Sequence, residues 1–498
     1  MFCLYYNSKN RSVSALNGSG CSPKALTMEV AKTDCPDGKG GIDASKFKAS
    51  PHSITVPGAA RGFEDLLEKH GSGKFTLADL LEPAAVLAEE GFPVAPLTAR
   101  YWSEDMHIIK RWLKWKEGDT VPLTVDGKNG PKPGDIVVNK DMARVLRDLG
   151  QKGATDGFYA GVTGQAIAAV VQKHGGKLTL EDLKEHRSTF PEPVSTEYRG
   201  ARLWEVPPNG QGVVALVALN GLRHLEQTGL CPELSPATLG KTADAYHVLI
   251  EMTRLGFEDA RAQVACPNHA KVPNEWFVDT ERIGQRAQKL FNPHKAIAKG
   301  LPTPSSCTVS FQVADLDGNA ISFVNSNYMG FGSGIVPEGC GFSLQNRGFG
   351  FTLNDIHHPN CLAPGKRPYH TIIPAILTHA DTNELYASMS NMGGYMQPQG
   401  HLQLTMNMIA GEMDPQQAID TPRFCIADGT RDGKVYMEGG VAESILKALQ
   451  EKGHNLVVNT VGYDRSVFGR AQIIKRDRQT GVYWAGSDGR SDGCAVGF

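Results

Sequence analysis

The sequence lacks a surplus of charge of either sign: 51 Lys and Arg residues stand against 53 Asp and Glu residues, for a formal net charge of −2. Without such a surplus, no field of the whole molecule attracts nucleic acid or anionic lipid, so neither partner is expected. No apolar run approaches the roughly 18 residues of a membrane span. The start of the chain lacks the basic and long apolar regions of a signal peptide, which predicts a cytoplasmic protein.

Cysteine is also sparse, and no two of the ten cysteines form a C-x-x-C pair. Neither a zinc ribbon nor a disulfide scaffold is therefore indicated. The sequence contains no G-x-G-x-x-G after a strand, no P-loop and no H-E-x-x-H, which argues against a dehydrogenase, an NTPase and a zincin. We predict that the protein uses no metal and no organic cofactor.

Short local patterns predict several helices and strands. Thr76 and Thr179 each precede an acidic residue by three positions, the spacing of a capping box at a helix start. An Asp-Gly turn at 317–318 between two alternating runs predicts a hairpin. The other predicted elements are strands Phe2–Tyr6, Val13–Leu16, Ile372–Leu377 and Leu385–Met389, and helices beginning at Thr242, Gly393-Gly394 and Val441. Helices and strands are segregated along the chain, so we predict an α+β fold.

Thr308 stands first in the predicted hairpin, directly after a Pro- and Ser-rich segment. If the preceding bond is cut, a threonine in this place gains an α-amino group that can take the proton of its own hydroxyl. Gly393 and Gly394, at a predicted helix start, offer backbone N–H groups for an oxyanion. By itself this pattern also fits an ordinary β-branched strand residue.

His357 and His358, beside Asp355, are the other candidate chemistry, a metal-dependent hydrolysis. Adjacent histidines on an extended loop point apart, whereas metal ligands must converge, so we favour a solvated loop.

Many short phrases of the chain, taken in their order, resemble the γ-glutamyltransferase family of N-terminal-nucleophile hydrolases. They include residues 17–20 (NGSG), 81–84 (LEPA), 90–94 (EGFPV), 207–212 (PPNGQG), 331–336 (FGSGIV), 364–368 (PGKRP) and 418–423 (AIDTPR). The phrases PPNGQG, QNRG (345–348) and MQPQ (396–399) are closest to the acylase and oxamate-amidohydrolase branch.

This resemblance implies a four-layer αββα sandwich, made as a precursor that cuts itself before a threonine. That threonine maps onto Thr308, and the cut falls between Cys307 and Thr308. It would divide the chain into a large portion, 1–307, and a small portion, 308–498, which stay together as a heterodimer, alone or as a dimer of two such pairs. The family's second threonine, which hydrogen-bonds the nucleophile, falls on Ser326, and the oxyanion glycines fall on Gly393 and Gly394.

The substrate positions depart from those of glutathione-cleaving members. Where the family holds the substrate's amino group, this chain has Gly350, Arg347 and Tyr328, and His370-Thr371 replaces a serine pair that holds a carboxylate. Arg347 would repel an ammonium group and attract a carboxylate or an oxo group. With Asn346, which we expect mainly to shape its loop, these residues are the predicted substrate contacts. We therefore expect a small amide other than glutathione.

Two further departures define the alternative interpretation. Relatives usually carry a segment upstream of the point where this chain begins, and this branch more often has an acidic residue or glycine at the position of Cys307, before the cut. The chain could therefore be a non-cleaving, inactive member or a truncated gene product that acts as a binding protein. The favoured prediction is an autoprocessing amidohydrolase, of the γ-glutamyl or another small acyl type, acting through an acyl-enzyme.

Overall fold

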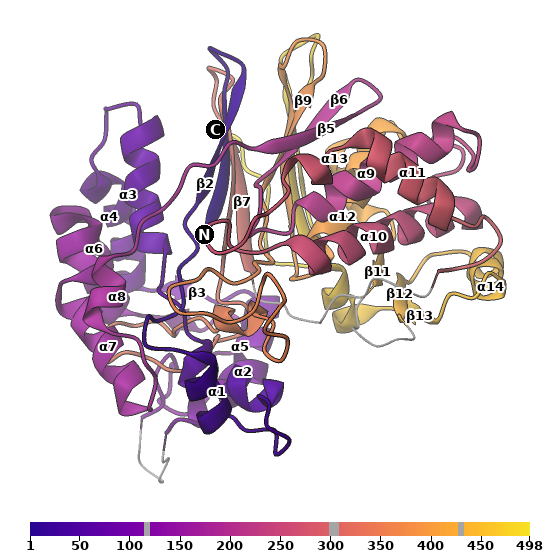
Figure 1. Ribbon diagram of the computed structural model, residues 1–498. Helices are drawn as coiled ribbons and strands as arrows, with labels where there is room; N and C mark the ends of the chain where they lie inside the picture. Colours follow the sequence, from indigo (N-terminus) through magenta and orange to yellow (C-terminus); the bar gives the residue numbers. More distant parts are fainter. Residues whose placement is uncertain (114–119, 298–307, 427–432) are drawn as a thin grey trace. The chain divides into compact units, whose positions relative to one another are not determined.

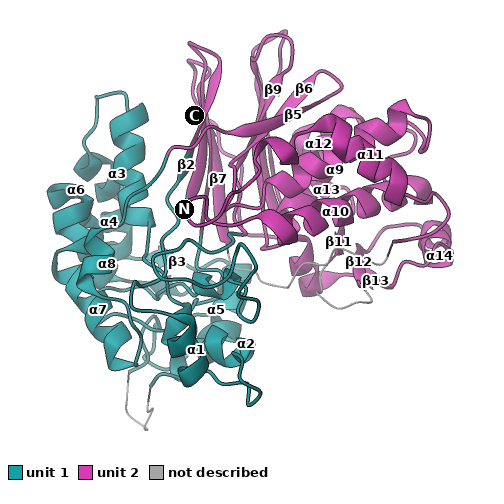
Figure 2. Ribbon diagram, in the orientation of Figure 1, with its two compact units in different colours: residues 1, 16–189, 326–370 teal, residues 2–15, 190–325, 371–498 magenta. Residues whose placement is uncertain are grey.

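Residues 1–113, 120–297, 308–426 and 433–498 are described by the computed structural model. The chain divides into two units, each made from separate stretches of sequence (Figure 2). Unit 1 comprises residues 1, 16–189 and 326–370, and unit 2 comprises residues 2–15, 190–325 and 371–498. Both units draw on residues before and after Thr308, so the division into 1–307 and 308–498 stays a prediction. Cys307 lies outside the described residues.

A four-stranded sheet has the strand order β2-β1-β8-β7. Its strands are β1 (Phe2–Asn7), β2 (Ser12–Asn17), β7 (Thr308–Ala314) and β8 (Ala320–Ser326). The predicted hairpin is confirmed: Asp315 donates its N–H to the Asn319 carbonyl at 3.0 Å, and Gly318 takes the positive φ, 89°, that the turn needs. The two predicted N-terminal strands are confirmed as well.

A six-stranded antiparallel sheet has the order β15-β14-β10-β9-β6-β5. Its strands are β5 (Val194–Tyr198), β6 (Ala201–Glu205), β9 (Ala375–His379), β10 (Leu385–Met392), β14 (Arg470–Arg476) and β15 (Tyr483–Ser487). The strand predicted from Ile372 begins three residues later, at Ala375. Ile373 donates its N–H to a side chain and Pro374 has no N–H, so neither can join the ladder.

The two sheets pack face to face. Ser322 donates its hydroxyl to the Met389 carbonyl at 2.8 Å, and Ser388 donates to the Ile321 carbonyl at 2.9 Å. Helices α9 (Val213–Gln227) and α12 (Met396–Ile409) pack on the six-stranded sheet, and α10 (Ala243–Gln263) packs on α9, which gives unit 2 its helical layer (Figure 1). The predicted α+β class is confirmed, and unit 2 supplies an α-β-β part of the predicted sandwich.

The predicted capping boxes are both present. Thr76 and Asp79 bond reciprocally at the start of α4 (Leu77–Glu90), and Thr179 and Asp182 do the same at α8 (Leu180–Lys184). Thr242 caps α10 through the N–H of Ala245. Among helices in the described ranges, none is long and apolar enough to cross a membrane.

The remaining elements complete each unit. In unit 1 they are α1 (Met28–Asp34), α2 (Ala44–Ala49), α3 (Ala59–His70), β3 (Phe92–Pro93), α5 (Pro96–Lys110), β4 (Ile136–Val137), α6 (Lys140–Ala154) and α7 (Val162–Lys173). In unit 2 they are α11 (Thr280–Leu290), α13 (Pro415–Asp420), β11 (Phe424–Ile426), β12 (Val435–Glu438), α14 (Glu443–Glu451) and β13 (Leu456–Thr460).

Candidate functional site

Thr308 is the first residue of β7, the edge strand of its sheet, and is only 8% exposed. Its hydroxyl oxygen lies 3.4 Å from Nε2 of Gln397, a fully buried residue in the first turn of α12. Ser326 closes β8, the neighbouring strand of the same hairpin. Because β7 and β8 are antiparallel strands of equal length, Thr308 and Ser326 occupy the end of the hairpin away from the turn.

Gly393 and Gly394 form a tight loop between β10 and α12. Their φ angles are 138° and 59°, in the region that side chains other than glycine's disfavour. A Cβ at Gly393 would lie 2.9 Å from Cα of Gly469, so the backbone of another loop also excludes a side chain there. The Gly394 carbonyl accepts from the N–H of Gln397 at 3.2 Å and from Nε2 of Gln211 at 2.9 Å. These two hydrogen bonds hold the backbone of the loop in place.

Thr371 joins this part of unit 2 through its backbone. Gln211, in the PPNGQG phrase, donates Nε2 to the Thr371 carbonyl at 2.6 Å as well as to Gly394. Both Gln211 and Thr371 are buried. The structure therefore brings Thr371, Gly394 and Gln397 together. The two prolines before Gln211 favour only turn structure at that position, and no sequence pattern assigns a role to Gln397. The signal that could have identified them is that both lie in phrases shared with the acylase and oxamate-amidohydrolase branch, Gln397 in MQPQ and Gln211 in PPNGQG.

Arg347 lies in unit 1 with Ser326 and Tyr328. Its Nη2 donates to the Ser326 hydroxyl at 2.9 Å, and its guanidinium lies over the Tyr328 ring, 4.6 Å from the centroid. The Tyr328 N–H also donates to the Ser326 hydroxyl at 2.9 Å, from a backbone with the unusual φ of 76°. A strained non-glycine residue of this kind is typical of a functional site. Three of the predicted site residues therefore form one cluster.

The neighbourhood of Arg347 is positively charged and buried. His370 is 4% exposed, and burial, together with Arg347 and Arg367, holds its pKa well below the ordinary value, so the ring is neutral. Arg367 donates to the Thr189 hydroxyl and the Arg187 carbonyl, both at 2.9 Å and both uncharged acceptors. Two guanidiniums beside a neutral imidazole favour an anion over a cation in this cluster.

The side chains of Gln345 and Asn346 differ in their hydrogen bonding. Gln345 shapes the loop: it donates to the Thr55 carbonyl at 2.6 Å and accepts from the Arg347 N–H at 2.5 Å. The Asn346 amide oxygen is buried without a hydrogen-bond partner among the described residues. Such a group is costly unless a ligand or water satisfies it, which favours the substrate-contact interpretation of Asn346 over the loop-shaping one.

Of the two histidines considered as metal ligands, His358 already uses a ring nitrogen: its Nδ1 accepts from the Asn360 N–H at 3.0 Å. The backbone N–H of His357 donates to the Asp355 carboxylate at 3.0 Å. In the ranges that the structure describes, the converging group of metal-type side chains is instead His247, Glu251 and His454. Arg254 already pairs with the Glu251 carboxylate at 2.8 Å, and the two imidazoles share one hydrogen bond of 2.7 Å. A divalent cation there would face a buried guanidinium, so we assign this group a structural role.

The tail at 487–493 is partly buried, and its buried charged side chains form ion pairs. Asp488 accepts from Arg490 at 2.9 Å and from Arg423 at 2.8 Å, and Glu438 accepts from Arg490 and from Arg465. Arg423 also donates to Asn391 and to the Phe468 carbonyl. Asn391 precedes the glycine loop by two residues and Phe468 precedes Gly469, so this network supports the backbone around Gly393.

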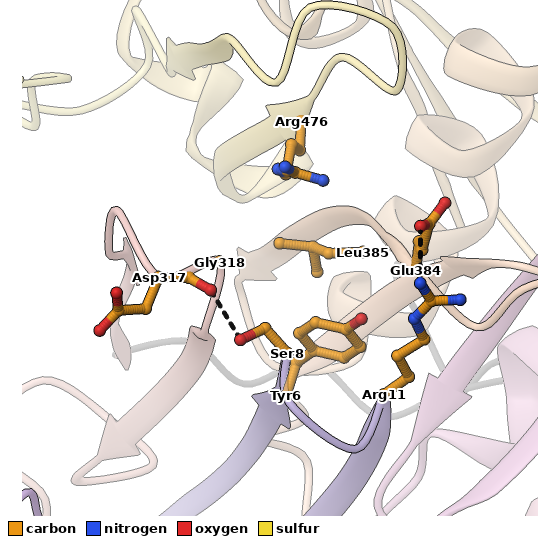
Figure 3. A pocket seen from close by; sticks show the side chains of 8 residues that line it. All are labelled: Tyr6, Ser8, Arg11, Asp317, Gly318, Glu384, Leu385 and Arg476. Carbon is orange, nitrogen blue, oxygen red and sulfur yellow. Dashed lines mark hydrogen bonds and ion pairs between the residues drawn. The ribbon is translucent and has the colours of Figure 1, made fainter.

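A surface pocket of unit 2 lies at the opposite end of the hairpin (Figure 3). It is lined by Tyr6, Ser8, Arg11, Asp317, Gly318, Glu384, Leu385 and Arg476. Arg11 pairs with Glu384 at 3.1 Å, and Ser8 donates to the Asp317 carbonyl at 2.7 Å. The seven residues of β7, at about 3.4 Å each, separate this pocket from Thr308. It therefore does not belong to the candidate nucleophile.

Comparison with known proteins gives a consistent picture. The family model described as gamma-glutamyltranspeptidase matches residues 1–498. The chain is 33% identical to a glutathione hydrolase-like YwrD proenzyme of Bacillus subtilis, with all of this chain and 89% of that protein covered. It is 29% identical to an oxamate amidohydrolase proenzyme of Klebsiella pneumoniae, covering 90% and 81%. The solved cephalosporin acylase from Bacillus halodurans superposes with a TM-score of 0.84 at 37% identity, covering 99% and 85%.

Proposed function

Since the chain belongs to the gamma-glutamyltranspeptidase family, whose members are hydrolases and transferases, we propose that it is a self-cleaving amidohydrolase with Thr308 as its nucleophile. The observation that carries the proposal is the place of Thr308: a buried threonine at the start of an edge strand, with an amide donor on its hydroxyl oxygen. In the uncut chain, this oxygen would attack the carbonyl of Cys307. The bond from that carbonyl to the Thr308 nitrogen breaks, and water hydrolyses the resulting ester.

The freed α-amino group then serves catalysis. It takes the Thr308 hydroxyl proton as the oxygen attacks the substrate amide, and it returns the proton to the leaving amine. The backbone of Gly393 and Gly394 supplies the oxyanion hole, a contribution worth about 10²–10³ in rate. Ser326 orients the nucleophile, and water resolves the acyl-enzyme. The portions 1–307 and 308–498 form the proposed heterodimer.

The proposed substrate is a small amide whose acyl part carries a carboxylate or an oxo group. The buried guanidinium of Arg347, with Arg367 nearby and a neutral His370, supports an anionic acyl group rather than one bearing an ammonium. Tyr328, Thr371 and Asn346 are the other proposed contacts. Two relatives named for oxamate and cephalosporin substrates are consistent with a branch that acts on varied amides.

The direct test is intact mass and N-terminal sequencing of the purified protein after incubation. We expect two chains of 307 and 191 residues, the shorter beginning Thr-Val-Ser-Phe. The cut protein is then screened for amine or ammonia release from oxamate, γ-glutamyl amides and neutral acyl amides. A chain that stays at 498 residues and releases nothing would refute the proposal and favour the non-cleaving alternative.

Replacing Arg347 should change substrate choice. In Arg347→Met, which keeps an unbranched apolar stem but removes the charge, we expect kcat/KM for an anionic acyl amide to fall by roughly 100-fold, the loss of one charge-assisted hydrogen bond. A neutral acyl amide should change by only a few-fold. Arg347→Lys, which keeps the charge, is the matched control and should retain the anionic preference. Rates are compared on the cut fraction, since Arg347 also contacts Ser326. Equal losses on both substrates would contradict the assignment.

A further inference from the structure

We infer that Gln397 sets the direction of the Thr308 hydroxyl and is a second catalytic side chain of the nucleophile. This inference rests on the proposed function. Gln397 is fully buried, and each end of its amide faces a different group. Oε1 accepts from the backbone N–H of Ile373 at 2.9 Å, and Nε2 lies 3.4 Å from the Thr308 hydroxyl oxygen. The second distance is at the long end of the range for a hydrogen bond.

The orientation of this amide follows from its partners alone. A backbone N–H can only donate, so the atom of Gln397 that faces Ile373 must be the carbonyl oxygen. The amide nitrogen must then face Thr308, and flipping the side chain would place two donors against each other. The Ile373 N–H is available for this purpose because the β9 ladder begins only at Ala375. The late start of β9 is thus part of the site.

The orientation of the Gln397 amide also determines where the proton of the Thr308 hydroxyl points. Because Nε2 donates to it, the oxygen accepts from Gln397, and its own single proton must point to another acceptor. In the cut enzyme that acceptor is the α-amino nitrogen, to which the proton passes as the oxygen forms its bond with the substrate carbon. The N–H of Gln397 also stabilises negative charge that develops on this oxygen. Self-cleavage uses the same oxygen and should depend on Gln397 as well.

Gln397 links the nucleophile to the oxyanion loop. Its backbone N–H donates to the Gly394 carbonyl at 3.2 Å, while its side chain reaches Thr308. Gln211 ties the same Gly394 carbonyl to Thr371, two residues before Ile373. The first turn of α12 and the segment 371–373 therefore hold Thr308 and the Gly393-Gly394 loop in fixed positions relative to each other. Groups that are already in place do not have to reorganise during the reaction.

The experiment reverses the hydrogen bond with a substitution of nearly the same shape. In Gln397→Glu, the ionised carboxylate can only accept, so it attracts the Thr308 proton away from the base. At pH 8 we expect kcat, and the rate of self-cleavage followed by intact mass, to fall roughly 100-fold, in line with the loss of one catalytic donor, with little change in KM. The substrate is the amide that wild type hydrolyses fastest.

Acid should partly restore this variant. When the introduced carboxyl gains a proton, its O–H can donate to Thr308 as the amide did, so the ratio of wild-type to variant kcat should shrink steadily from pH 8 to pH 5. Gln403→Glu is the matched control. Gln403 lies on the same helix, and its amide bonds the N–H and the carbonyl of Phe424, both at 3.0 Å. That variant should show a constant ratio.

Failure of the inference about Gln397 can be distinguished from failure of the proposed function. A Gln397→Glu protein as active as wild type at every pH would overturn the inference, and so would the same pH-dependent recovery in Gln403→Glu. If Gln397→Glu fails to fold, as judged by its thermal melt, Gln397→Met removes the donor without adding charge and should still lose kcat at constant KM. A wild-type chain that neither splits nor hydrolyses any amide would instead refute the proposed function itself.

Discussion

Thr308→Ala is expected to remain a single chain of 498 residues and to lose amide hydrolysis, on the order of 10⁴-fold or more, because nucleophile and base are the same residue. Removal of the hydroxyl abolishes attack on the Cys307 carbonyl, so the α-amino group is never freed. Intact mass after prolonged incubation measures the first effect, and release of amine from the best wild-type substrate measures the second.

Two variants control this experiment. Thr308→Ser restores a hydroxyl and should cut and turn over, though more slowly, because the missing methyl leaves the side chain less restricted. Thr480→Ala changes a threonine in the exposed turn between β14 and β15 and should cut at the wild-type rate. Cleavage at 307/308 in Thr308→Ala would mean that another group does the chemistry, and the assignment would fall.

Asp488→Asn is expected to destabilise the protein by about 3–5 kcal/mol, since it leaves buried guanidiniums without one of their two counter-ions. The carboxylate is fully buried and accepts from Arg423, from Arg490 and from the backbone N–H of Ala471 at 2.7 Å. Urea denaturation followed by tryptophan fluorescence measures the loss. Asp381→Asn is the matched control: Asp381 pairs with Arg478 on the surface and its side chain is 62% exposed, so no measurable change is expected.

The same network predicts an acid dependence. Burial acts to raise the pKa of Asp488, but Arg423 and Arg490 outweigh it and hold the pKa below the ordinary value. A carboxyl with a lowered folded pKa contributes stability above its unfolded pKa, near 3.9, and loses that contribution as the pH falls further. Wild type should therefore lose more stability than Asp488→Asn between pH 5 and pH 3. Equal losses would show that Asp488 is not ionised in the fold.

A large part of the local structure is predictable from the sequence because its causes are local. The capping boxes at Thr76 and Thr179 need only residues three positions apart, and the hairpin after Thr308 needs only alternation and an Asp-Gly turn. The prediction of a helix that opens at Gly393-Gly394 is of the same kind, although α12 begins a little later, at Met396. Membership of the gamma-glutamyltranspeptidase family is likewise predictable from the sequence, because its short phrases occur in order along the whole chain.

Which distant side chains meet depends on the tertiary structure and has no signal in local sequence patterns. Gln211 and Gly394 are 183 residues apart, and Gln397 and Thr308 are 89 apart. No spacing rule relates such positions. The orientation of the Gln397 amide depends on one backbone N–H, that of Ile373, which does not join the sheet because β9 begins only at Ala375. The burial of Asp488 and Arg490 is equally invisible in a Gly- and Ser-rich tail. The elements and the nucleophile candidate are predictable because they follow from short-range hydrogen bonding and periodicity, whereas the surroundings of that nucleophile depend on long-range packing.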